Sequence, residues 1–205
     1  VDRNSRPVEQ VKYGLHLIAP TITLTNSLSH TLRYHPDTPS AAIQSISVTA
    51  QFAADGALSL RYLVVGKITG IKLPAPRIAG PADNLWQQTC CEAFVASADG
   101  EPYREFNFSP SAQWAIYQFA AYRQRDNHFQ PLAIPRITLH QQADGFELAA
   151  TIPSELIPPG DVLDLALTTV IEASDGSKSY WALRHGAAQP DFHLRQSFTL
   201  ALKRN

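Results

Sequence analysis

The chain has 205 residues, of which 44% are hydrophobic, and its formal net charge is −1. This length and apolar content suffice for one large domain, or two small ones, with a sizeable core. The near-neutral charge argues against nucleic acid or an anionic membrane as the main partner, because both attract concentrated Lys and Arg. In addition, no apolar run reaches the ~18–20 residues of a membrane-spanning helix.

The first part of the chain shows no well-specified element. The segment at residues 13–28 follows a few basic residues, as the apolar part of a signal peptide would. However, His16 and Pro20 interrupt it, and no small-x-small cleavage site stands out. We therefore expect residues 1–32 to form an extension ahead of a single domain that spans residues 33–205.

From residue 46 onward, apolar and polar residues alternate with a period of two, which is typical of half-buried β-strands. Residues 46–52 and 58–64 alternate on either side of Asp55-Gly56, a pair that favours a tight turn, and therefore predict a hairpin. Residues 113–122 are compatible with a strand or a short helix. Further strands are expected at residues 89–96, 103–108, 137–140, 146–152, 163–171, 179–185 and 198–202.

These elements predict the fold class. About nine or ten short strands, turns built on Asp-Gly pairs and the absence of a long helical period indicate an all-β fold. Most of the 15 prolines fall between the expected strands, where they leave the ladders intact. We predict an antiparallel β-sandwich with Greek-key or jelly-roll connections.

The only two cysteines, Cys90 and Cys91, are neighbours in an expected strand. Adjacent cysteines rarely bridge each other, because the geometry strains the intervening peptide. Without a distant partner no disulfide framework is possible, which favours a reducing, cytoplasmic location over a secreted or periplasmic one. We expect the thiol pair to be small buried residues that point to opposite faces of the strand.

Two side chains around these cysteines have possible functions. Glu92 shares a strand face with Phe94 and Ala96, so its carboxyl group must meet solvent, a partner or a polar pocket. Trp86 precedes the strand. Its ring could belong to the core, or it could stack on the apolar face of a sugar while a nearby carboxylate accepts hydroxyl groups.

A second aromatic and polar cluster follows at residues 180–185. If this segment is a strand, Trp181 and His185 share one face, and Tyr180 and Arg184 share the other. Trp181 could be a core residue and Arg184 the partner of an exposed acid. Alternatively, the two could form a second wall of a binding site.

The sequence patterns that would indicate an enzyme are weaker than those for a binding site. His185, Asp191 and His193 lie within nine residues and are types that bind zinc, so a metal-dependent enzyme stays an alternative, although the spacing fits no compact motif. Glu92 and Glu105 could form a carboxylate pair, but hydrolysis of glycosides needs a placed acid and base. The chain has no P-loop, dinucleotide fingerprint or zinc-finger spacing.

Three blocks resemble one known family. LWQQTCCEAFVA (85–96), YREFNFSPSAQWAIYQF (103–119) and YWALRHGAAQPDFH (180–193) are similar to bacterial DOMON-like domains related to family 9 carbohydrate-binding modules. The resemblance covers most of the chain, from about residue 32 to residue 202. It implies a β-sandwich of jelly-roll type without catalytic activity. Some wider DOMON domains hold haem through Met and His, but this chain has no Met, and no cofactor is expected.

The resemblance also implies a binding site. In sugar-binding relatives a Trp precedes a strand whose Glu lies six residues further on, a polar residue follows on the next strand, and a late Trp closes the site. The residues that match, together with Arg184, define the predicted saccharide or polyol site: Trp86, Glu92, Glu105, Asn107, Trp181 and Arg184. A structural or interaction protein without a small-molecule ligand, in which the aromatic residues are all core, is the other alternative.

Overall fold

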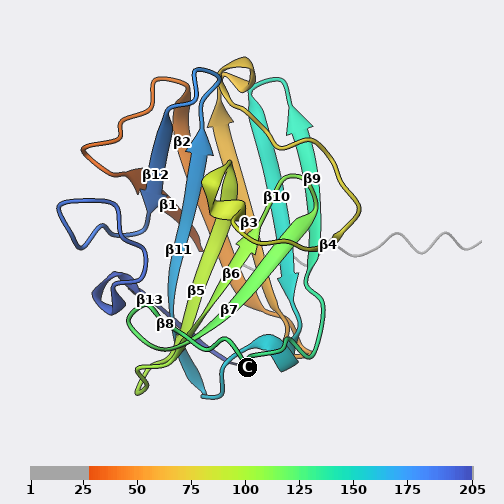
Figure 1. Cartoon of the computed structure of the whole chain (residues 1–205), viewed down its shortest axis with the longest axis vertical. Coiled ribbons are helices and arrows are strands. Elements are labelled where there is room, and N and C mark those ends of the chain that lie inside the picture. Colours follow the sequence, from red (N-terminus) through yellow and green to blue (C-terminus); the bar gives the residue numbers. More distant parts are fainter. Residues whose placement is uncertain (1–27, 205) are drawn as a thin grey trace, which may run out of the picture.

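A computed structural model describes residues 28–204, which consist almost entirely of strands and loops (Figure 1). The strands are β1 (Ser29–Tyr34), β2 (Ile43–Phe52), β3 (Leu58–Gly66), β4 (Gly80–Pro81), β5 (Cys90–Ser97), β6 (Tyr103–Phe108), β7 (Gln113–Ala121), β8 (Gln124–Arg125), β9 (Arg136–Gln142), β10 (Gly145–Ile152), β11 (Val162–Glu172), β12 (Lys178–Ala182) and β13 (Leu200–Lys203). The described helices are three-residue 3₁₀ turns, too short to cross a membrane: η1 (Ile68–Gly70), η2 (Leu85–Gln87), η3 (Ser154–Leu156) and η4 (Arg195–Ser197).

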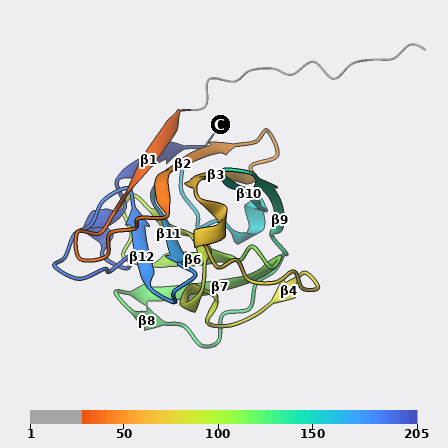
Figure 2. The ribbon, with the colours of Figure 1, turned by 90° about the horizontal axis from the view of Figure 1, so that it is seen from above.

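The strands form one curled sheet, in the order β4-β7-β6-β5-β11-β12-β1-β2-β3-β10-β9. Strand β1 connects the two halves, because residues 29–32 pair with β2 while Arg33 and Tyr34 pair with β12. Seen from above, the two halves lie opposite each other (Figure 2). The predicted all-β class is confirmed. The finer jelly-roll description stays a prediction, and the sheet is mixed, since β4 pairs with β7 in parallel.

The main apolar core lies between the two halves of the sheet. Alternate side chains point into it from both halves, as shown by Val48 and Leu60 on one side and Phe106 and Leu165 on the other, all at most 2% exposed. Burial of such side chains is the largest favourable contribution to folding. The core therefore holds β5 and β6 in place, and these strands carry the acidic residues of the candidate site.

The Asp-Gly turns are confirmed. Asp55-Gly56 connects β2 to β3 and Asp175-Gly176 connects β11 to β12, with positive φ angles of 79° and 86° at the glycines. Glycine takes this left-handed conformation without the steric cost that other residues incur. Residues 113–121 form strand β7 rather than a helix, because they pair with β6.

The domain begins earlier than expected. Residues 29–32, which the sequence placed in the extension, belong to β1, while residues 1–27 lie outside the described residues. Leu32 is the only buried residue of β1, so this strand lacks the alternation of buried and exposed residues that marks β2 and β3. The two-residue strands β4 and β8 were also missed, since they are too short to show a period.

A second apolar cluster covers the outer face of the sheet, meaning the face of β5, β6, β7, β11 and β12 that is turned away from the main core. Phe94 and Tyr103 belong to it, and so do Phe192 and Phe198, from the segment at 183–199 that follows β12. The rings of Phe94 and Phe198 lie 5.9 Å apart between centroids. The 183–199 segment is thereby anchored on the outer face.

Candidate ligand-binding site

A cavity of about 650 Å³ opens on the outer face of the sheet. Its wall combines side chains of the sheet, of the loop after β1, of the loop before β5, of the turn after β7 and of the 183–199 segment. The residues that line it are Asp37, Thr38, Asn84, Trp86, Glu92, Phe94, Glu105, Tyr117, Phe119, Arg123, Arg125, Val170, Tyr180, Gln189, Pro190, Phe192 and His193. Aromatic surface with a few convergent polar groups is typical of small-molecule sites.

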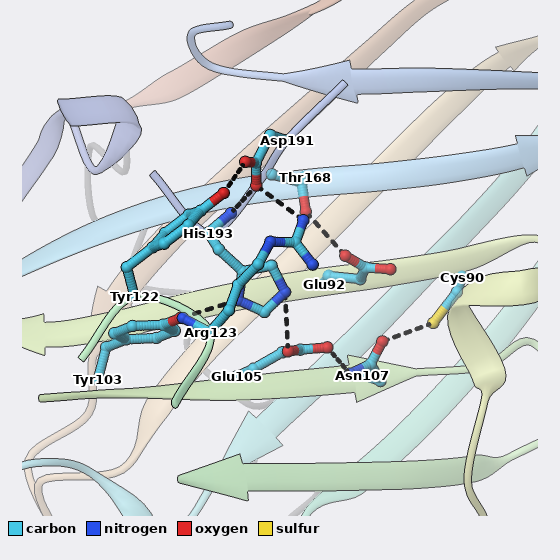
Figure 3. Close-up of polar contacts among 10 residues, drawn as sticks. All are labelled: Cys90, Glu92, Tyr103, Glu105, Asn107, Tyr122, Arg123, Thr168, Asp191 and His193. Carbon is cyan, nitrogen blue, oxygen red and sulfur yellow. Dashed lines mark hydrogen bonds and ion pairs between the residues drawn. The ribbon is translucent and has the colours of Figure 1, made fainter. Parts of the chain in front are cut away.

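Two acids, Glu92 on β5 and Glu105 on β6, line the cavity and are only 2% and 5% exposed. The Asn107 amide donates to Glu105 Oε1 at 2.7 Å and accepts a weak bond from the Cys90 thiol at 3.7 Å (Figure 3). The Thr168 hydroxyl donates to Glu92 Oε2 at 3.3 Å. Glu92 Oε1 is buried and has no hydrogen-bond partner among the described residues. An unmet buried acceptor is costly, so this oxygen is a candidate contact for a ligand.

Burial changes the protonation of both acids. It raises the pKa of Glu92 well above its ordinary value, and the nearby negative charge of Glu105 adds to the effect. Burial likewise raises the pKa of Glu105, although the hydrogen bond from Asn107 opposes it. A carboxyl group that keeps its proton can donate as well as accept a hydrogen bond. Glu92 and Glu105 can therefore act both as hydrogen-bond donors and as hydrogen-bond acceptors toward the hydroxyl groups of a ligand.

His193 forms the neighbouring part of the wall. Its Nε2 lies 3.7 Å from Glu105 Oε2 and its Nδ1 lies 2.9 Å from the Tyr103 hydroxyl, while its ring packs edge-on against Phe119. Burial, together with the positive charge of Arg123, lowers the pKa of His193 to about 4. The imidazole is therefore neutral at pH 7, and it lies beside Glu105 without forming an ion pair.

A polar clamp fixes the 183–199 segment beside the cavity. The Asp191 carboxylate accepts from the Tyr122 hydroxyl at 2.6 Å, from the Arg123 guanidinium at 3.0 Å and from the His193 backbone amide at 3.0 Å (Figure 3). Burial opposes ionisation of Asp191, but these hydrogen bonds lower its pKa below the ordinary value. The clamp joins the turn after β7 to the segment that covers the outer face.

Trp86 marks the rim of the cavity. It lies in η2, immediately before β5, and its side chain is 44% exposed although it is large and apolar. On another part of the wall, the Arg125 guanidinium lies 3.9 Å from the centroid of the Tyr117 ring. Trp86 thus has an exposed aromatic ring, whereas the guanidinium of Arg125 already covers the ring of Tyr117.

The structure brings together three of the predicted site residues. Trp86, Glu92 and Glu105 all line the cavity. Asn107 lies beneath them, fully buried, and contacts Glu105 rather than the cavity. The family resemblance pointed to Trp86 and Glu105, while the alternation along β5 placed Glu92 on the face of Phe94, because residues two apart on a strand share a face.

Trp181 does not line the cavity, although the predicted site included it. Glu92 pairs with Thr168, and Thr168 pairs with Ala182, so these residues share one face of the sheet and their neighbour Trp181 points to the other. Trp181 is 3% exposed in the main core, where its indole N–H donates to Ser179. The expectation that Trp181 faces Trp86 across a groove is therefore wrong.

Arg184 is also absent from the wall, because β12 ends at Ala182 and the Arg184 side chain is exposed beyond it. In its place the cavity is lined by Tyr180, Arg123 and His193. The alternation with Trp181 indicated that Tyr180 points to the opposite face, but not that this face is the one that carries Glu92. The sequence did not indicate that Arg123 belongs to the site, because Arg123 lies in the turn after β7, where no strand periodicity predicts the direction of a side chain.

The alternative metal triad is not supported. Within residues 28–204, no group of three or more His, Cys, Asp or Glu side chains is arranged to hold a metal ion. Asp191 is engaged by Tyr122 and Arg123, and His185 Nε2 bonds the backbone oxygen of Arg33 at 2.8 Å. The side chains of the three residues thus contact different partners, although Asp191 also accepts a hydrogen bond from the His193 backbone amide.

The chain matches no model of a known protein family and no curated protein. Solved structures share its fold. A candidate carbohydrate-binding protein from Bacteroides uniformis superposes with a TM-score of 0.67 at 17% identity, over 86% of each chain. A family 9 carbohydrate-binding module from Caldicellulosiruptor kristjanssonii in complex with glucose gives a TM-score of 0.53 at 13% identity, over 87% of this chain and 84% of that one. Its complex with cellotriose gives 0.51 at 13%, over 87% and 82%.

Proposed function

We propose that the chain is a non-catalytic module, DOMON-like in fold, that binds a small saccharide or a similar polyol in the cavity on its outer face. One observation carries the proposal. An exposed indole, Trp86, stands at the mouth of a cavity that is also lined by Glu92, a buried acid with an unmet hydrogen-bond acceptor.

The chemistry of a pyranose fits this arrangement. A sugar ring has an apolar C–H face that can stack on an aromatic side chain such as Trp86, and hydroxyl groups that both donate and accept. A hydroxyl that donates to Glu92 Oε1 would relieve the cost of the unpaired oxygen. Glu105, which accepts a hydrogen bond from Asn107, is positioned to fix a second hydroxyl.

The shared fold supports the same conclusion, since the Caldicellulosiruptor kristjanssonii module was solved with glucose and with cellotriose. The acids also favour binding over hydrolysis. Glu92 and Glu105 lie on adjacent strands of one wall, whereas a glycoside hydrolase places its two carboxyl groups on either side of the scissile bond.

Calorimetric titration with a panel of mono- and disaccharides, including glucose, tests the proposal. We expect measurable binding by the wild type and at least a tenfold loss in Trp86→Ala. The matched control is Ile78→Ala, which removes another exposed apolar side chain outside the cavity and should bind as the wild type does. Absence of heat with every sugar, or unchanged binding by Trp86→Ala, would overturn the proposal.

A further inference from the structure

The charges of the cavity wall are unevenly partnered. Three acids line it: Asp37, Glu92 and Glu105. Among residues 28–204, neither Asp37 nor Glu92 forms an ion pair. Glu105 lies 3.7 Å from His193 Nε2, and the positive charges of Arg123 and Arg125 also act on it and oppose the rise of its pKa. The wall therefore contains two acids, Asp37 and Glu92, that have no cationic partner among the described residues.

Both arginines of the wall, by contrast, are already engaged by acids that do not line the cavity. The Arg123 guanidinium bonds Asp191 at 3.0 Å. The Arg125 guanidinium lies 3.9 Å from Asp83 Oδ1 and covers the ring of Tyr117. Since each arginine already has an acidic partner, the ionisable groups without a partner that a ligand meets are the acids Asp37 and Glu92.

We propose that the preferred ligand of this cavity is a saccharide that carries an ammonium group, that is, an amino sugar. This inference rests on the proposed function and specifies its ligand class. The ammonium group would provide the cation that Glu92 and Asp37 lack, through charge-assisted hydrogen bonds, which are stronger than neutral ones. The aromatic faces of Trp86 and Tyr180, also in the wall, favour a cation as well.

Such binding has a proton balance that can be measured. In the free protein the buried acids Glu92 and Glu105 favour their protonated forms. An ammonium group beside Glu92 stabilises its carboxylate, so a proton leaves the carboxyl group for the solvent as the ligand binds. A neutral sugar brings no charge and releases no proton.

The test is calorimetric titration with glucosamine, glucose and N-acetylglucosamine at pH 6.5 and low salt, in phosphate and in Tris buffer. We expect glucosamine to bind about tenfold more tightly than glucose, which corresponds to about 1.4 kcal/mol. We also expect its heat alone to depend on the buffer, through proton release. N-acetylglucosamine, in which the nitrogen is uncharged, should show no advantage over glucose.

Two failures are distinguishable. Equal or weaker binding of glucosamine relative to glucose overturns this inference and leaves the saccharide proposal standing. If none of the three sugars binds, the proposed function falls together with the inference.

Substitutions of the two acids test whether they cause the preference for glucosamine. Glu92→Gln should reduce the ratio of glucosamine to glucose affinity severalfold, and Asp37→Asn, at an exposed position, provides a second variant that is independent of core folding. Glu101→Gln makes the same charge change outside the cavity and should keep the wild-type ratio. A ratio that is unchanged in both Glu92→Gln and Asp37→Asn would overturn the assignment.

Discussion

His193 Nε2 lies 3.7 Å from Glu105 Oε2, although the two residues belong to distant parts of the chain, β6 and the segment that follows β12. The contact places the 183–199 segment against the wall of the cavity, where the hydrogen bonds of Asp191 with Tyr122 and Arg123 anchor it. Because the imidazole is buried against aromatic rings, it is stable there in its neutral form. Protonation of His193 at acidic pH therefore opposes its burial in this position.

Stability at acidic pH should depend on His193. Its pKa is lowered to about 4 in the folded protein, so the unfolded chain takes up a proton first as the pH falls below about 6.5. The contribution of His193 to folding is therefore lost between about pH 6.5 and pH 4, and amounts to at most about 3 kcal/mol. Between pH 7 and pH 4.5, His193→Gln should lose roughly 2 kcal/mol less unfolding free energy than the wild type.

Urea unfolding of both proteins at the two pH values measures this difference. His128→Gln, which alters an exposed histidine outside the cavity, is the control and should follow the wild type. Equal losses in His193→Gln and the wild type would contradict the prediction.

Glu92 should have the opposite effect at alkaline pH. Its pKa is raised by burial and by Glu105, so the folded state binds the proton more tightly than the unfolded chain. The stability that this provides is complete below the ordinary pKa of a glutamate and is lost as the pH rises through the raised pKa. Glu92→Gln, a neutral residue of similar shape, should therefore lose less unfolding free energy than the wild type between pH 5 and pH 9.

Thermal unfolding of the two proteins at pH 5 and pH 9 gives the comparison. The exposed variant Glu101→Gln should show the pH dependence of the wild type. If Glu92→Gln showed that same dependence, Glu92 would not carry the proton that its burial implies.

The two tryptophans should differ sharply in their effect on stability. Trp181→Ala removes a side chain that is 3% exposed in the main core and should cost about 3–5 kcal/mol of unfolding free energy. Trp86→Ala removes a side chain that is 44% exposed at the rim and should cost less than about 1 kcal/mol. Chemical denaturation of both variants tests this, and similar costs would mean that Trp86 is a core residue.

The strand that carries Glu92 is tied to the opposite half of the sheet by Tyr62. The Tyr62 hydroxyl is fully buried and donates to the backbone oxygen of Glu92 at 2.7 Å. Tyr62→Phe should lower the unfolding free energy by about 1 kcal/mol, because it removes one buried hydrogen bond while it keeps the ring. Tyr34→Phe, at a 48% exposed tyrosine, should cost less than about 0.5 kcal/mol in the same urea titration.

Several features of the molecule were readable from the sequence. Alternation along residues 91–96 placed Glu92 on the face of Phe94, and the Phe94 face is indeed the one that lines the cavity. The Asp-Gly pairs located the hairpin turns. Both signals are local: a strand has a period of two, and a tight turn needs a residue that tolerates positive φ.

Only the tertiary structure decided how these strands combine into a site. The alternation of Tyr180 and Trp181 showed that they point to opposite faces, but not which of them shares a face with Glu92. That depends on the register between β5, β11 and β12, which backbone hydrogen bonds and core packing set jointly. Arg123 and His193 reach the cavity from a turn and a loop, whose paths follow from long-range contacts rather than from any local period.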